Sequence, residues 1–196
     1  NGFAIEAEAG RVTLENSGLV TGRIAFSSAD DVINNSGRFA AALTSNFSAG
    51  DDVFNNTGVL SLADPTSTTP RTAFFNNLER LNNAGIIDLA NGVAGDVFTV
   101  SGMVNGQTAN SVILDLDLRG GTPTADRIVA GGFEGLNHIV LNLQGDASLE
   151  QTGVIIAESG MAQTGAEMDV RVAEGGFIGY GVTFADGAYR LDAKLA

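Results

Sequence analysis

The chain has 196 residues and a net charge of −13 at pH 7, with 44% hydrophobic and 17% charged residues. An acidic chain without a Lys/Arg cluster is repelled by a phosphate backbone, so nucleic-acid binding is not expected. The absence of cysteine excludes disulfides, thiolate metal sites and a cysteine nucleophile, and the 26 glycines indicate many turns.

The N-terminal half repeats one short phrase, at Leu14–Gly18, Ile33–Gly37, Phe54–Gly58 and Leu81–Gly85. Each copy has an apolar residue, a polar pair rich in Asn, a small residue and a Gly. The copies follow one another about every twenty residues, with a longer third interval. Such a period is typical of a solenoid, in which each turn of the chain (a rung) buries its apolar side against neighbouring rungs.

Aligning the copies on their Gly places apolar residues in columns on both sides of the polar pair. The column before the pair contains Leu14, Ile33, Phe54 and Leu81, and a column after the Gly contains Val20, Phe39, Leu60 and Ile87. Apolar positions of the same parity on both sides of a turn indicate strand, turn and strand with one buried face. We therefore predict an all-β fold, a parallel β-helix with its rungs in residues 1–109.

The residue two positions before each Gly is always Asn, namely Asn16, Asn35, Asn56 and Asn83. An amide side chain can hydrogen-bond to the copy in the next rung, so this column predicts a structural asparagine ladder. The Gly that follows is expected to supply a positive φ for the turn.

Acidic residues recur at equivalent places ahead of the phrase, at Asp31, Asp52 and Glu79. Stacked in register, they would lie about 5 Å apart, where like charges repel. A solvated strand edge tolerates this repulsion and is the expected arrangement. A calcium ion held by the three carboxylates is the alternative. No other metal and no cofactor is expected.

The longer third interval contains 63–72, a polar segment with two prolines that predicts a loop projecting from a rung. Beyond the last copy, short apolar runs predict strands at 95–102, 112–118, 127–130, 138–143, 153–158, 168–172, 177–184 and 189–195, with a turn at 120–126. Residues 110–196 are interpreted as a β-rich cap, because an uncovered last rung would expose unpaired strand edges.

His138 is the only histidine of the chain. A Ser-His-Asp triad would have to use it, but no nucleophile-elbow sequence is present, and the segment 145–148 has Ala147 where a nucleophilic Ser would stand. We predict that His138 is a structural residue at a strand edge, that no residue is catalytic, and that the chain is not an enzyme.

Three segments of the second half, Gly95–Gly102, Ser111–Leu118 and Thr122–Gly131, occur in the order found in the passengers of bacterial autotransporters. Two later segments, Gly153–Glu158 and Gly187–Leu191, also fit this order. Over about residues 80–196 the chain thus resembles the last part of a passenger, before the membrane β-barrel, and the repeated phrases resemble its β-helical stem.

The resemblance implies a right-handed β-helix and a type V secreted protein at the cell surface or outer membrane of a Gram-negative bacterium, or released after cleavage. It implies a non-enzymatic segment of an adhesin-like or virulence-associated protein. This segment would act as stem and, through an autochaperone region, as folding nucleus. The implied partners are the C-terminal β-barrel of the same polypeptide, outside these residues, and a host or cell-surface receptor.

Two other functions stay open from the residues alone. Paired carboxylates are typical of carbohydrate-active β-helix enzymes, either lyases or hydrolases. A purely adhesive module would instead bind a host or cell-surface ligand through the rung faces or the 63–72 loop.

Overall fold

The computed structural model describes residues 2–120, 122–145, 152–161, 166–172 and 178–195. These residues form strands, turns and loops, and no helix, so the prediction of an all-β fold is confirmed. No described segment therefore forms a helix that could cross a membrane.

The strands are named in chain order. They are β1 (Ile5–Glu6), β2 (Thr13–Asn16), β3 (Leu19–Gly22), β4 (Ile24–Ala25), β5 (Val32–Asn35), β6 (Arg38–Ala41), β7 (Leu43–Asn46), β8 (Val53–Asn56), β9 (Val59–Leu62), β10 (Thr72–Asn76), β11 (Arg80–Asn83), β12 (Ile86–Asp88), β13 (Val97–Gly106), β14 (Ser111–Asp117), β15 (Thr124–Ala125), β16 (Arg127–Gln144), β17 (Thr152–Ser159), β18 (Glu167–Val172), β19 (Ile178–Ala185) and β20 (Ala188–Leu195).

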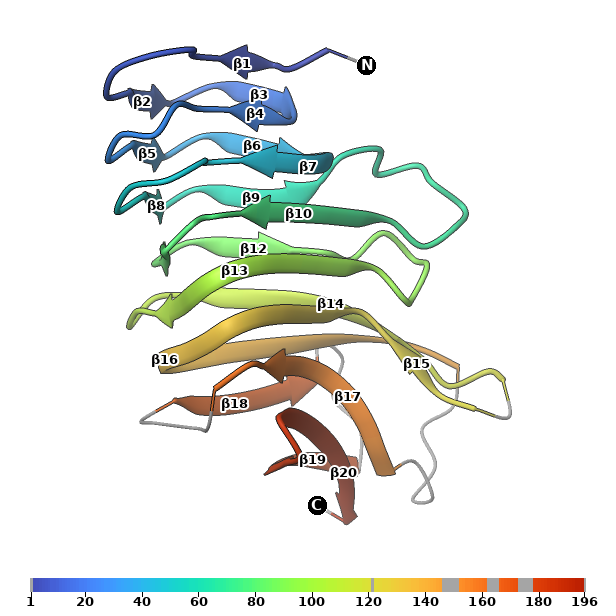
Figure 1. The fold of residues 1–196 in the computed structure, drawn as a ribbon. Coiled ribbons are helices and arrows are strands. Elements are labelled where there is room, and N and C mark those ends of the chain that lie inside the picture. Colours follow the sequence, from blue (N-terminus) through green and yellow to red (C-terminus); the bar gives the residue numbers. More distant parts are fainter. Residues whose placement is uncertain (1, 121, 146–151, 162–165, 173–177, 196) are drawn as a thin grey trace.

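Three rows of parallel strands run along the molecule, because each rung contributes one strand to each row (Figure 1). The first row is β2, β5, β8, β11 and the second half of β13, and the second row is β3, β6, β9, β12 and β14. The third row is β1, β4, β7, β10 and the first half of β13. The long strand β16 continues all three rows. The prediction of a parallel β-solenoid is thus confirmed.

The apolar columns stack in the predicted register. Leu14 pairs with Ile33, Ile33 with Phe54, and Phe54 with Leu81. The last three side chains are fully buried, whereas Leu14 is half-buried near the N-terminal end. The second column pairs in register in the same way, through Val20, Phe39, Leu60 and Ile87. Burial of apolar area in such columns is the main force that holds successive rungs together.

The core between the rows is rich in phenylalanine. The ring of Phe75 lies 5.0 Å from that of Phe98, 5.5 Å from that of Phe54 and 5.6 Å from that of Phe47, centre to centre. Aromatic pairs at such distances add about 0.5–1.5 kcal/mol each to the burial of their area. The wide rungs of the N-terminal half are therefore filled by aromatic side chains.

The glycines of the phrase are required by close contact and not by φ. Gly37, Gly58 and Gly85 all have ordinary negative or extended φ, which corrects the expectation of a positive φ. A Cβ on Gly58 would overlap the carbonyl oxygen of Gly37, and a Cβ on Gly85 would overlap that of Gly58. Turns of neighbouring rungs therefore stack with backbone against backbone, which no larger residue permits.

The parallel pairing continues past the predicted boundary between 109 and 110, because β12 pairs with β14 across it. The strands predicted at 127–130 and 138–143 are parts of one strand, β16. Between them, Gly132 pairs with Met103 and Gly135 with Gly106 of β13, so the strand continues although Gly135 has a positive φ of 68°. The structure places the predicted turn at 120–126 between β14 and β16, around the short strand β15.

Antiparallel strands lie at the C-terminal end of the solenoid (Figure 1). Strand β20 pairs antiparallel with both β17 and β19, whereas β17 pairs parallel with β16. From β20, Tyr189 and Leu191 are buried in the common core, and the ring of Tyr189 lies 5.5 Å from that of Phe133. The hairpin β19–β20 thus covers the last rungs.

Candidate functional site

The structure brings the four asparagines of the phrase together in one buried row. Asn16 Nδ2 donates to Asn35 Oδ1 at 2.7 Å, Asn35 Nδ2 to Asn56 Oδ1 at 2.8 Å, and Asn56 Nδ2 to Asn83 Oδ1 at 2.8 Å. Asn16 Nδ2 also donates to the backbone carbonyl of Arg38, and Asn56 Nδ2 to that of Ile86, each in the next rung. The donors of these amides are used within the protein, so the row holds turns together and offers no ligand site.

A second row of amides lies on the outer side of the first strand row, and the sequence reasoning missed it. Asn55 Nδ2 donates to Asn34 Oδ1 and Asn82 Nδ2 to Asn55 Oδ1, both at 2.9 Å. Asn105 extends the row at one end, and Asn34 donates to Glu15 Oε1 at the other. The doubled Asn of the phrase was its signal, because adjacent residues of a strand point to opposite faces.

The sequence led us to expect a solvated strand edge for the three acidic candidates, and the structure contradicts this for two of them. Asp31 and Asp52 are completely buried, and only Glu79 is exposed. Asp31 Oδ1 accepts the N–H of Val12 at 2.6 Å, Asp52 Oδ1 that of Asp31 at 2.7 Å, and Glu79 Oε2 that of Asp52 at 2.9 Å. Each carboxylate thus satisfies a backbone donor of the preceding rung, and this hydrogen bond offsets part of the cost of burying Asp31 and Asp52.

These carboxylates form no metal site in the structure. Among the described residues, no three His, Asp or Glu side chains are grouped so that they could hold a metal ion, and this includes Asp31, Asp52 and Glu79. Burial raises the pKa of Asp52 to about 6. The hydrogen bond from the Asp31 N–H lowers this pKa, but its effect is smaller than that of burial. One oxygen of Asp31 and one of Asp52 are buried without a hydrogen-bond partner. For Asp52, this buried and unpartnered oxygen favours the protonated acid.

A second acidic row stands at another corner of the solenoid, again directly before strands. Asp96 Oδ1 accepts the N–H of Arg71 at 2.5 Å, and Asp126 Oδ1 accepts the N–H of Asp96 at 2.8 Å. Asp126 Oδ2 also accepts the N–H of Asp115 at 2.8 Å. Burial raises the pKa of Asp126 to about 7. The hydrogen bonds from the N–H groups of Asp115 and Asp96 lower this pKa, but their effect is smaller than that of burial. Both rows share one sequence pattern, an acidic residue immediately before a strand, but this pattern alone does not tell that the side chain is buried.

The predicted 63–72 loop lies between β9 and β10 and projects from the solenoid (Figure 1). Its last residue but one, Arg71, turns back to the core and contacts Asp96, donating from Nε to Oδ2 at 2.8 Å and also from Nη2. Arg71 Nη2 also donates to the carbonyl of Leu89 at 2.5 Å, and Asn91 Nδ2 donates to that of Ser67 at 3.1 Å. The loop is therefore tied to the next rung at its base.

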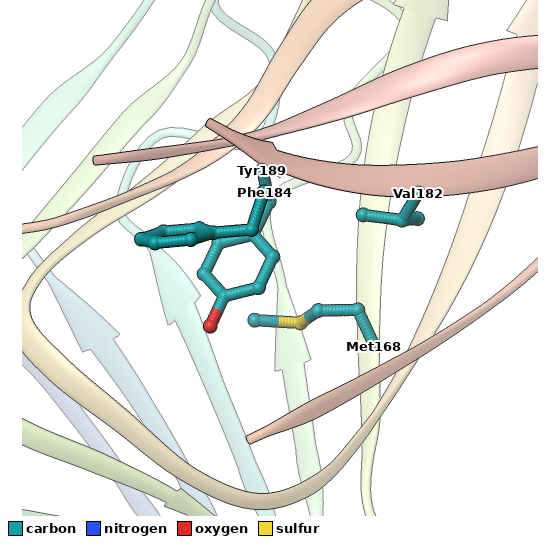
Figure 2. Close-up of a pocket in the computed structure, with 4 residues that line it drawn as sticks. All are labelled: Met168, Val182, Phe184 and Tyr189. Atoms are coloured by element: carbon teal, nitrogen blue, oxygen red, sulfur yellow. The ribbon is translucent and has the colours of Figure 1, made fainter. Parts of the chain in front are cut away.

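A small apolar pocket lies beneath the C-terminal hairpin. It measures about 80 Å³ and is lined by Met168 from β18, Val182 and Phe184 from β19, and Tyr189 from β20. Figure 2 shows the thioether of Met168 facing the ring of Tyr189. A space of this size holds a few water molecules at most, so the pocket is a packing gap of the cap.

A larger hollow is a surface cleft of about 400 Å³ beside the turn at 107–110. It is lined by Thr108, Ala109, Asn110, Ser111, His138, Ile139, Val140 and Arg171. His138 Nδ1 lies 3.0 Å from Asp169 Oδ2, which also accepts Arg171 Nη2 at 2.9 Å. The hydrogen bond from His138 holds the pKa of Asp169 below its usual value, aided by Arg171. The structure thus gives His138 a charged partner that the sequence did not reveal.

The segment compared with a nucleophile motif, 145–148, lies mostly outside the described residues.

Comparison with known proteins does not place the chain in a family. No protein-family description matches it, and no curated protein matches it significantly.

Proposed function

We propose that the chain is a non-enzymatic passenger segment of a bacterial autotransporter, acting as stem and as folding nucleus. The support from sequence is the order of its C-terminal motifs. The support from geometry is the position of the hairpin β19–β20, which covers the C-terminal end of the solenoid core through Tyr189. That capped end is the observation that carries the proposal.

The proposed mechanism is mechanical. Strands of the last rungs expose their backbone groups to the preceding rung, so a folded C-terminal end offers a template for the next strand. Each added rung buries another set of apolar and aromatic side chains and gains free energy. Emergence from the membrane with the C-terminal end folded first would let this gain draw the remaining chain outward. The location implied is the cell surface or outer membrane, or the medium after cleavage.

Removal of residues 110–196 tests this proposal. We expect residues 1–109 alone to lose cooperative refolding, measured by circular dichroism after dilution from denaturant. Replacement of 64–70 by a short glycine turn is the control, because it removes an exposed loop and leaves Arg71 and the C-terminal strands in place. An unchanged melting curve for residues 1–109 would contradict the proposal.

A binding role for the same stem is the second candidate, and one observation favours it. The loop 63–71 and the neighbouring loop 89–96 are joined by Arg71 and Asn91, so they present one continuous surface beside the solenoid. Loops fixed on a rigid scaffold commonly carry binding residues. Loss of cell adhesion on replacing 64–70, with stability unchanged, would support this role.

A further inference from the structure

We propose that Ser111 is an acyl-accepting serine, with His138 as its base and Asp169 as the carboxylate that orients His138. The reaction is the covalent acylation of Ser111 by an activated ester. This site does not rest on the proposed stem function. Acylation of Ser111 could therefore be found or missed whatever the truncation of residues 110–196 shows about folding.

Asp169 fixes the form of the imidazole. An ionised carboxylate only accepts hydrogen bonds, and Arg171 and His138 both keep Asp169 ionised. The proton between His138 Nδ1 and Asp169 Oδ2 therefore belongs to His138, and in the neutral ring Nε2 is then the acceptor. A neutral imidazole with Nδ1–H bound to a carboxylate and Nε2 free is the arrangement that general bases require.

Ser111 lies in the rung next to His138, on the side away from Asp169. Val112 pairs with Ile139 and His138 pairs with Asp169, so Ser111, His138 and Asp169 occupy one column of three successive rungs. Neighbouring parallel strands lie about 4.8 Å apart. Along β14 and β16 the buried residues Val112 and Ile139 alternate with these partly exposed ones. All three side chains therefore stand on the outer face.

The cleft gives a reactant access to this column. Ser111 and His138 both line it, and its rim is the exposed turn at Thr108 and Ala109. Asn110 fixes that turn against the neighbouring rung, since its Oδ1 accepts the N–H of His138 at 3.1 Å and its Nδ2 donates to the carbonyl of Leu136 at 2.6 Å. The turn that precedes Ser111 is thus held by the strand that carries its base.

The chemical step is an acyl transfer. The hydroxyl of Ser111 gives its proton to His138 Nε2 while Oγ attacks the carbonyl carbon of the ester. The ester C–O bond then breaks, and the departing alkoxide or phenoxide takes the proton from His138. The products are O-acyl-Ser111 and one alcohol or phenol, and His138 returns to its neutral form.

The test uses the whole chain with p-nitrophenyl acetate and locates the acetyl group by peptide mass spectrometry. We expect acetyl on Ser111 and none at that peptide in Ser111→Ala. His138→Gln should slow acetylation of Ser111 by about 10²-fold, the usual contribution of a general base. Ser17→Ala, at an exposed serine without a histidine nearby, is the matched control and should change nothing. Equal acetylation of Ser17 and Ser111, or an unchanged rate in His138→Gln, would overturn the proposal.

Nuclear magnetic resonance of the imidazole nitrogens tests the base without any substitution at Ser111. Because His138 is the only histidine, its two nitrogen signals are assigned without ambiguity. We expect the Nδ1–H tautomer at neutral pH, and a shift toward the Nε2–H tautomer in Asp169→Asn. A dominant Nε2–H tautomer in the unaltered chain would overturn the assignment of Asp169, even if a variant folds poorly.

Discussion

Arg71 and Asp96 form an ion pair whose two side chains are buried, with exposed fractions of 9% and 0%, although 25 residues separate them in the chain. The other ion pairs of the described residues are all partly exposed on both sides. Arg71 also holds the loop 63–71 against the next rung through the carbonyl of Leu89. One side chain thus joins the largest loop insertion to the buried acidic row.

Replacing Arg71 by Met should destabilise the protein by about 3–5 kcal/mol, because it leaves the carboxylate of Asp96 buried without its cation. Denaturant unfolding at pH 7 measures the change. Arg80→Met is the control, since the Arg80–Glu134 pair is about 40% exposed on each side. An exposed pair contributes at most about 1 kcal/mol. Equal losses for the two variants would contradict a special role for Arg71.

Gly58→Ala should destabilise the solenoid by about 1–3 kcal/mol or more, since a methyl group has no space against the backbone of Gly37. Gly18→Ala provides a matched control at the same place in the first copy of the phrase. No atom lies within 4 Å of a Cβ on Gly18. Thermal unfolding of both variants measures the difference. If Gly18→Ala cost as much as Gly58→Ala, stacking of turns would not be the reason for the glycine.

The buried Asp52 should make stability depend on pH. Its pKa is raised from 3.8 to about 6 in the folded protein, so the folded state binds this proton more tightly than the unfolded chain does. The stabilisation from this proton is complete below pH 4 and is lost as the pH rises through 6. Asp52→Asn keeps the acceptor oxygen for the N–H of Asp31 and cannot ionise.

We therefore expect Asp52→Asn to be more stable than the unaltered chain at pH 8, and the advantage to vanish near pH 4. Melting curves at several pH values measure this. The neighbouring Asp51 is exposed, so Asp51→Asn should leave the pH profile unchanged. A profile of Asp52→Asn parallel to that of the unaltered chain would show that Asp52 does not carry the dependence.

The sequence predicts the parts of this molecule that repeat. Phe39, Phe54 and the buried asparagines are predictable because the same residue type returns at the same place in each rung, and the phase of the strand then determines its face. The exposed fraction of Asp31 is not predictable in this way. Whether a residue before a strand faces the core depends on which backbone donors of the preceding rung lack a partner, and only the three-dimensional stacking shows this.

The contacts outside the repeats were not predictable. Arg71 and Asp96 belong to no repeated phrase, and the interval that separates them contains a loop of arbitrary length. The same is true of Ser111, His138 and Asp169, which occupy one column because β14, β16 and β18 lie in consecutive rungs. Their intervals of 27 and 31 residues differ from the first two steps of the phrase, 19 and 21 residues, so sequence spacing alone does not align them.

The proposed function requires that the C-terminal end of the chain folds first, and the folding rates of core variants at the two ends of the solenoid measure this order. Tyr189→Leu and Leu191→Ala remove contacts of the cap, since the ring of Tyr189 packs against that of Phe133. Ile33→Val and Phe54→Leu remove contacts of early rungs. Each change in rate is compared with the loss of stability of the same variant. We expect the cap variants to slow refolding in proportion to their lost stability, and the early-rung variants mainly to speed unfolding. Slow refolding of the early-rung variants, with the cap variants affecting only unfolding, would show that folding does not begin at the C-terminal end.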